Sequence, residues 1–295
     1  MSRITLQPSL RGTLVADEVG GPVADLLFGR AASVLSGALA LVTAVACLAA
    51  LAVPGAIRSP AATVGNMQGT ALVLLVVTTP LLVISIVRVR AGHPAWILGW
   101  LGAAGSAAYQ SVLFLFGTPF NPFFHLYVAL LGLAVWTLVA TAGRLPVAEL
   151  EARIGANAPR RLVAGYLVVN AVLFGLLWLK ATGPAVLGPM PPAFLDGTGM
   201  TTGPVQIIDF AFTLPAMLLA AWLLWRSRPW GRLLGGSLLV MLAIESTSIG
   251  VDQWMGSAAD PTSPASSAAL TPMFAVLTVI GLVVLALFLR PARER

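Results

Sequence analysis

Eight continuous apolar runs, each about as long as a membrane is thick, dominate this sequence. A helix needs about 20 apolar residues to cross the hydrocarbon core of a bilayer. The runs cover residues 31–53, 70–88, 95–117, 122–143, 162–180, 206–226, 231–251 and 270–290. They are rich in Leu and Ala and lack the two-residue alternation of membrane-spanning strands. The sequence therefore predicts an all-α protein, a polytopic membrane bundle of about eight transmembrane helices.

Composition excludes a soluble protein and argues against nucleic acid as a partner. Hydrophobic residues make up 58% of the 295 residues and charged residues only 9%, whereas soluble domains carry about 25% charged residues. The net charge of +6 comes from arginines placed between the apolar runs, where they can contact anionic headgroups of the membrane lipid. The sequence contains no helix-turn-helix, zinc-finger or RNA-binding pattern.

Basic residues alternate between the connections and predict an orientation. Basic residues close to the cytoplasmic face resist translocation, so they mark inner segments. With the N-terminus inside, fifteen of the seventeen Lys and Arg residues fall in inner segments, and only Arg58 and Lys180 fall outside. We therefore predict a multi-pass protein of a bacterial-type cell membrane with both termini in the cytoplasm.

The helix count divides the chain into two halves. The predicted segments are a cytoplasmic N-terminal segment (1–30), a first four-helix half (31–143), a cytoplasmic loop (144–161), a second four-helix half (162–290) and a cytoplasmic tail (291–295). Within the first segment, residues 15–28 suit a short amphipathic helix on the inner membrane surface. A plain disordered tail is the alternative interpretation.

A shift of 135 residues aligns parts of the two halves. Residues 78–111 and 213–246 are identical at six of 34 positions. The matches include helix-breaking prolines, and Gln110 aligns with Glu245. An even number of helices in each half would make the repeat parallel, with an axis along the membrane normal. The alternative is that apolar helices resemble one another through composition. No pair of broken helices is evident from the sequence.

Three acidic residues lie within the apolar runs or at their ends, and each is a candidate site residue. An ionisable side chain inside a membrane costs several kcal/mol unless it faces protein or water. Glu245, Ser248 and Asp252 fall at positions i, i+3 and i+7, on one helix face. Asp209 and Thr213 share a face at i and i+4. We expect Asp209 about one turn, and Glu245 about two turns, below the outer surface.

Other polar residues fall at a similar predicted depth. Tyr109 and Gln110 lie two turns from the outer end of their run, and Asn121, His125 and Tyr127 begin the next run. The inner halves of the runs are nearly all apolar. The pattern predicts a polar pocket that opens outward and binds a small or lipophilic molecule, or couples to protons.

Each of these candidates has a structural alternative. Polar side chains often hold transmembrane helices together without further function. His125 suits a hydrogen-bonded structural residue, and Asp252 suits a solvated residue of an outer loop. If Asp209 and Glu245 lie close together, repulsion and burial would favour a proton shared between them.

Metal and nucleotide chemistry find little support in the sequence. The two histidines, His93 and His125, are too few for a three-histidine zinc site, and Cys47 is the single cysteine. The chain has no GxxxxGKS/T loop and no GxSxG motif. We expect neither a metal site nor a cofactor.

Two segments resemble a known group of proteins. NPFFHLYVALLGLAVWTL (121–138) and IIDFAFTLPAMLLAAWLLWRSRPWG (207–231) together cover about a seventh of the chain. They are similar to segments of an uncharacterised family of multi-spanning bacterial and archaeal membrane proteins. The resemblance implies that Asn121, Tyr127 and Asp209 belong to the family's pattern, and it implies no function.

Three functions remain open at this level. The first is transport, or binding of a small molecule or lipid, in a pocket of the outer half. The second is an intramembrane enzyme that uses paired carboxylates as general acid and base on a lipophilic substrate. The third is a structural or assembly partner of another membrane protein.

Overall fold

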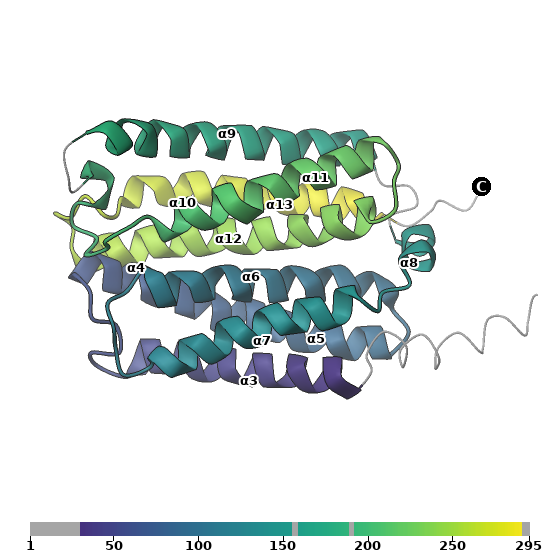
Figure 1. Ribbon diagram of the computed structural model, residues 1–295, viewed down its shortest axis with the longest axis horizontal. Helices are drawn as coiled ribbons and strands as arrows, with labels where there is room; N and C mark the ends of the chain where they lie inside the picture. The colour runs from purple at the N-terminus through teal and green to yellow at the C-terminus, as the bar shows by residue number, and fades with distance from the viewer. Residues whose placement is uncertain (1–29, 155–158, 189–191, 291–295) are drawn as a thin grey trace, which may run out of the picture.

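The computed structural model describes residues 30–154, 159–188 and 192–290, and this part of the chain is helical without any strand (Figure 1). Eight helical spans are long and apolar enough to cross a membrane. Helices are expected there because lipid offers no partner for free backbone groups, so each span must satisfy its own. The predicted all-α bundle is confirmed. The predictions for residues 15–28 and 291–295 lie outside the described residues.

The spans follow the predicted order, and two of them contain a π turn. The first four are α3 (Arg30–Ala52), α4–η2–α5 (Ala61–Val73, Leu74–Thr78 and Thr79–Arg90), η3–α6 (Pro94–Trp96 and Ile97–Phe116) and α7 (Phe124–Ala142). The last four are α9 (Arg160–Leu187), α10–η5–α11 (Pro204–Ile208, Asp209–Thr213 and Leu214–Trp225), α12 (Gly231–Ala259) and η6–α13 (Ala268–Leu270 and Thr271–Phe288). Short helices α8 (Val147–Arg153) and η4 (Ala193–Leu195) lie in the connections.

The two halves of the chain lie side by side along the bundle (Figure 1). The spans of the first half occupy the lower part of the view and those of the second half the upper part. Helix α12 packs against α4 and α6 of the first half and against α11 and α13 of its own half. Spans α6 and α12 are mostly buried, whereas α9 and α13 lie at the periphery. The central helices α6 and α12 therefore carry five of the ten predicted site residues: Tyr109, Gln110, Glu245, Ser248 and Asp252.

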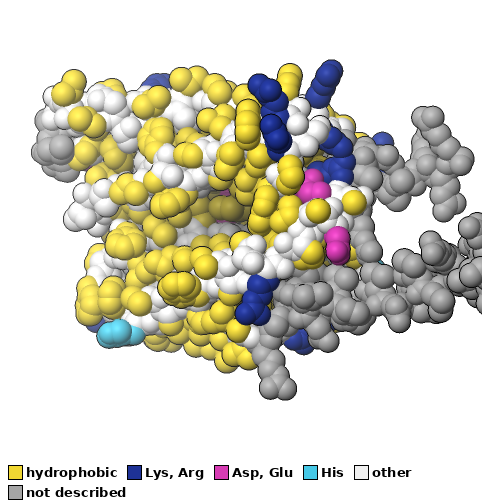
Figure 2. Space-filling model, turned by 45° about the vertical axis from the view of Figure 1, so that its right-hand side comes forward, with side chains coloured by type: hydrophobic (Ala, Val, Ile, Leu, Met, Phe, Trp, Pro, Cys, Tyr) yellow, Lys and Arg dark blue, Asp and Glu magenta, His cyan; other side chains and the backbone are white. Residues whose placement is uncertain are grey.

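Arginines gather at one end of the bundle, the end that carries α8 (Figure 2). We call this the basic end and define it by the arginines that follow or precede the spans there. They are Arg88, Arg90, Arg144, Arg160, Arg226, Arg228 and Arg232. The sides of the bundle are covered mainly by apolar side chains (Figure 2), as a surface in contact with lipid tails requires.

Helix ends differ from the prediction where polar residues continue a helix. Helix α12 runs on to Ala259 instead of ending near residue 251, and α4 begins at Ala61 instead of near residue 70. The two extensions pack against each other, so protein contacts stabilise helical turns that hydropathy alone does not reveal. As a result Glu245 is the central residue of α12, and Asp252 lies within the helix.

The second and sixth spans each contain a five-residue π turn. One turn is η2 (Leu74–Thr78) and the other is η5 (Asp209–Thr213), and a shift of 135 residues relates them. Each ends two residues before a proline, which has no backbone N–H for the helix ladder. Thr79 Oγ1 donates to the carbonyl of Leu74 over 2.9 Å and compensates part of the disruption. Both spans continue as single helices through these π turns, so the structure, like the sequence, shows no pair of broken helices within the described residues.

Candidate functional site

Glu245 lies in the middle of the bundle, where α12 meets α6. The side chain is 7% exposed. Ser106 Oγ donates a hydrogen bond to Oε1 over 2.7 Å, and the Gln110 amide donates to Oε2. The same amide lies 3.5 Å from Ser248 Oγ, one turn further along α12. The predicted group of Gln110, Glu245 and Ser248 is therefore a set of contacts between two central helices.

Asp252 is buried between α12 and α4, about two turns from Glu245. Thr70 Oγ1 lies 3.1 Å from each carboxyl oxygen. Helix α4 comes this close because residue 69 is glycine: a Cβ there would lie 2.8 Å from the backbone N and Cα of Asp252. The alternative interpretation of Asp252 as a solvated loop residue is wrong.

Asp209 is the first residue of the π turn η5. The indole Nε1 of Trp178 in α9 donates to Oδ2 over 2.7 Å. Tyr109 of α6 and Thr213 of the same turn also interact with this carboxyl group. Asp209 is buried, and its partners lie in three different spans.

The three carboxyl groups form a row, which we call the acidic row (Asp209, Glu245 and Asp252). Glu245 lies close enough to both aspartates for their charges to interact. Within residues 30–154, 159–188 and 192–290, no Lys, Arg or His forms an ion pair with any of the three. Nor do the described His, Cys, Asp and Glu residues group in threes suited to a metal ion. The hydrogen-bond donors to the row in the described part of the chain are neutral hydroxyl, amide and indole groups.

Three predicted residues lie outside this network. Asn121 closes the turn before α7, where its side chain accepts from the N–H of Phe123 and donates to the carbonyl of Pro119. His125 is exposed and lies edge-on to Phe124. The buried Tyr127 stacks on Phe114 with a centroid distance of 4.9 Å. The hydroxyl group of Tyr127 is buried without a hydrogen-bond partner in the described part of the chain. None of these contacts involves an acidic side chain.

Three donors to the acidic row were missed in the sequence. Thr70, Ser106 and Trp178 are common residue types within apolar runs, and each donates to a different acid. A signal existed for one of them, since Ser106 and Gln110 lie at i and i+4 on the same face of α6. Trp178 is the least predictable, because tryptophan near a span end is usually an interfacial residue.

Two hollows of the bundle lie apart from the acidic row. A cavity of about 490 Å³ between α5, α6, α12 and α13 has an apolar wall that includes Val77, Trp96 and Leu282. Another of about 410 Å³ lies between α9 and α10, lined by Phe194 and Gln206 among others. None of the three acids lines either of these two cavities. A lipophilic molecule bound in the apolar cavity would therefore not meet a carboxyl group.

No protein-family model, curated protein or solved structure matches this chain. The fold and the site define its class: an α-helical, multi-pass membrane protein with carboxyl groups buried between its central helices. The resemblance of residues 121–138 and 207–231 to an uncharacterised membrane-protein family stays a prediction.

Removal of the Thr70 hydroxyl should destabilise the contact between α4 and α12. In Thr70→Val the Asp252 carboxyl group loses its hydroxyl donor, and we expect the free energy of unfolding to fall by about 1–3 kcal/mol. Unfolding of the purified protein in mixed detergent micelles measures this change. Thr182→Val is the matched control, because Thr182 bonds only to the carbonyl of Trp178 in its own helix. An equal effect of the two substitutions would contradict the prediction.

Proposed function

We propose that this protein binds and transports a small molecule, and that the acidic row takes up and releases protons during the transport cycle. The observation that carries the proposal is the burial of three carboxyl groups whose partners in the described part of the chain are all uncharged. An intramembrane carboxyl group without a basic partner is costly to keep ionised and is typical of proton relays in transporters. A purely structural contact would not need three such groups.

The π turns of the second and sixth spans support transport. π turns are frequent at functional sites, and transporter sites often lie at the interface between two repeats. The turn η5 begins with Asp209 itself, and its counterpart η2 lies at the matching position of the first half. An enzyme acting on a lipophilic substrate finds less support, because the apolar cavity has no acid in its wall.

We further propose that residues 31–143 and 162–290 are a parallel repeat, with the segment 144–161 as the loop between them. Three contacts join positions that are 135 residues apart. Thr63 Oγ1 donates to the carbonyl of Thr198 over 2.8 Å, and the Gln110 amide donates to Glu245. A Cβ on Gly102 would lie 2.8 Å from the carbonyl oxygen of Ser237. Equivalent residues meet in this way when they lie beside a two-fold axis, and apolar composition alone would not produce such pairs.

For the orientation, we propose that the basic end faces the cytoplasm, following the positive-inside rule. The acidic row then begins at Glu245 in the middle of the bundle. It continues with Asp252 about two turns of α12 further from the basic end, and Asp209 lies near the start of its span, also away from that end. This arrangement supports access to the row from outside the cell.

Proteoliposomes with an entrapped pH-sensitive dye test the proposal. Small molecules from a substrate panel are added outside, and substrate-dependent proton movement is expected for the wild type. We expect Asp209→Asn to lower the rate at least about tenfold, because an amide cannot release the proton that a carboxyl group carries. Unchanged proton movement in Asp209→Asn, or none in the wild type with any compound, would contradict the proposal.

Asp260 provides the control for this experiment. It follows α12, and hydrogen bonds from the side chain and backbone of Thr262 hold the pKa of its carboxyl group below the usual range. Asp260 is therefore an ionised acid outside the membrane-spanning segment. Asp260→Asn should leave the rate of proton movement unchanged.

A further inference from the structure

A second site with different chemistry lies at the basic end. A cavity of about 320 Å³, open on one side, lies between α8, the start of α9, the end of α11 with the turn that follows it, and the start of α12. Its wall contains three arginines, Arg160, Arg228 and Arg232, and one acid, Glu151. The wall therefore carries more positive than negative charge, the opposite of the acidic row.

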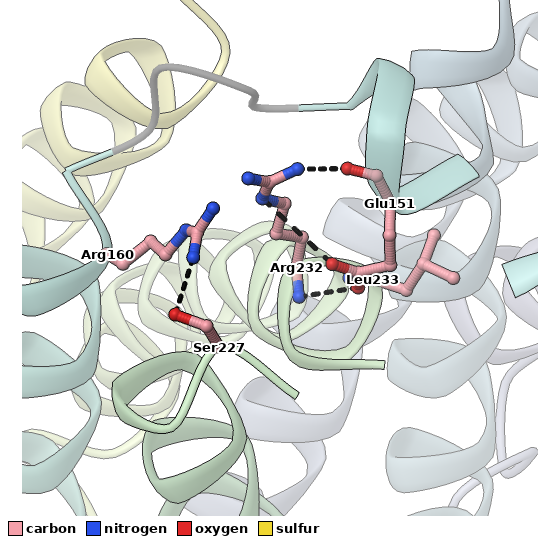
Figure 3. A network of polar contacts seen from close by, with 5 residues as sticks. All are labelled: Glu151, Arg160, Ser227, Arg232 and Leu233. Carbon is pink, nitrogen blue, oxygen red and sulfur yellow. Dashed lines mark hydrogen bonds and ion pairs between the residues drawn. The ribbon is translucent and has the colours of Figure 1, made fainter. Parts of the chain in front are cut away.

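The Glu151 side chain interacts with one of these arginines, Arg232, and with the backbone at the start of α12. Its carboxyl oxygen Oε1 accepts from the backbone N–H groups of Arg232 and Leu233 over 2.8 and 3.1 Å. Oε2 lies 4.0 Å from Nε of Arg232, whose guanidinium also donates to the Glu151 carbonyl. Figure 3 shows this set of contacts joining α8 to α12. The single carboxylate of the wall thus neutralises Arg232.

The other two arginines pair with no carboxylate of the described residues. Arg160 Nη1 donates to the hydroxyl of Ser227 over 2.6 Å, a neutral partner. Arg228 is exposed, and its side chain makes no hydrogen bond or ion pair within the part of the chain that the structure describes. Arg160 and Arg232 lie close enough for their charges to repel, and their guanidinium groups turn toward one another in Figure 3. An anion placed between them would remove this repulsion.

The turn that carries Ser227 and Arg228 contains two non-glycine residues with a positive φ angle. Ser227 has φ of 51° and Trp230 has φ of 73°, conformations that non-glycine residues rarely adopt. The chain reverses sharply there, which directs both Ser227 and Arg228 into the wall of the cavity. The site is therefore built from three separate segments: the start of α9, this turn and the start of α12.

We propose that this cavity binds a phosphate group, held by Arg160, Arg228 and the hydroxyl of Ser227. The guanidinium group presents a planar fork of N–H donors that matches two oxygens of a phosphate. A cavity of about 320 Å³ is at the small end of ligand sites, which suits a phosphate and a short ester. Two sources share this chemistry: the headgroup of an anionic phospholipid at the membrane surface, and a water-soluble phosphate.

Binding to the purified full-length protein in detergent tests the proposal. The probes are dioctanoyl phosphatidylglycerol and inorganic phosphate, measured by calorimetry and by native mass spectrometry. We expect Arg228→Gln to weaken the affinity about tenfold for whichever probe the wild type binds, as loss of a charged hydrogen-bond donor does. The double variant Arg160→Gln with Arg228→Gln should weaken this affinity further. Binding of the phospholipid alone identifies a headgroup site, and binding of inorganic phosphate identifies a site for a free anion.

Arg144→Gln is the matched control. Arg144 is an exposed arginine at the same end of the bundle and does not line the cavity. Its replacement should leave the affinity unchanged. Arg228 is exposed, so Arg228→Gln is expected to fold even if the double variant does not. Absence of binding for both probes, or equal losses in Arg144→Gln and Arg228→Gln, would overturn the proposal. This result is independent of proton movement through the acidic row.

Discussion

Gly69→Leu is expected to separate α4 from α12 and to lower the yield of folded protein sharply. A Cβ at residue 69 would lie 2.8 Å from backbone atoms of Asp252, and one at residue 65 would lie 2.5 Å from the carbonyl oxygen of Met255. Backbone atoms cannot rotate away as a side chain can, so the helices must move apart. We expect a loss of about 3 kcal/mol or more, at the upper end for overpacked sites. The free energy of unfolding in mixed micelles and the monodisperse yield measure it.

Gly132→Leu is the control for this prediction. Gly132 lies within α7, and a Cβ there would meet nothing within 4 Å. The same substitution should change the free energy of unfolding by no more than about 0.5 kcal/mol. If Gly132→Leu proved as harmful as Gly69→Leu, the loss would come from leucine in a span rather than from the close approach of α4 and α12.

Glu245→Gln is expected to abolish substrate-dependent proton movement, with a decrease of about 100-fold. Glutamine keeps the shape of glutamate but cannot carry the proton, and proton transfer by one positioned group contributes about 10²–10⁴-fold. The exchanged pair Gln110→Glu with Glu245→Gln should restore part of the rate. The two positions are 135 residues apart and touch across α6 and α12, so the exchange moves the carboxyl group only to the other side of the same contact. The dye-loaded proteoliposomes measure each rate.

Infrared spectroscopy provides a readout for the same variants that does not depend on a substrate. The carbonyl stretch of a protonated carboxyl group should weaken in Glu245→Gln and return in the exchanged pair. Thr182→Val serves again as the control, and its carbonyl stretch should be the same as that of the wild type. Full proton movement in Glu245→Gln would contradict the role of this residue, and a folded but inactive exchanged pair would contradict the equivalence of the two positions.

The acidic row and some of its partners, such as Gln110, could be predicted from the sequence, but the donors Thr70, Ser106 and Trp178 could not. Asp209, Glu245 and Asp252 stand out because a carboxyl group inside an apolar run is rare and must face protein or water. Their donors are ordinary residues, and they are distant in the chain: Thr70 is 182 residues from Asp252, and Ser106 is 139 residues from Glu245. A window along the sequence cannot show which helices will meet.

The glycines of α4 show a signal that was present and overlooked. Gly65 and Gly69 have the small-xxx-small spacing that allows close helix packing. They lie in a stretch with Asn66 and Gln68 that hydropathy places outside the second apolar run, and so the helix was predicted to begin too late. The packing against α12 makes this stretch helical and brings Thr70 to Asp252.

The number and order of the spans, the asymmetry of the basic residues and the position of Asp209 and Glu245 within apolar runs were determined by the sequence alone. Each depends on the cost of moving a residue or a run of about 20 residues between water and lipid, which is a local property. The pairing of helices was decided only by the tertiary structure. An apolar helix face is as well solvated by lipid as by another helix, so contacts between spans depend on shape complementarity and on hydrogen bonds between the helices. Gly69 against Asp252 and Trp178 against Asp209 are such contacts, and only the packed bundle contains them.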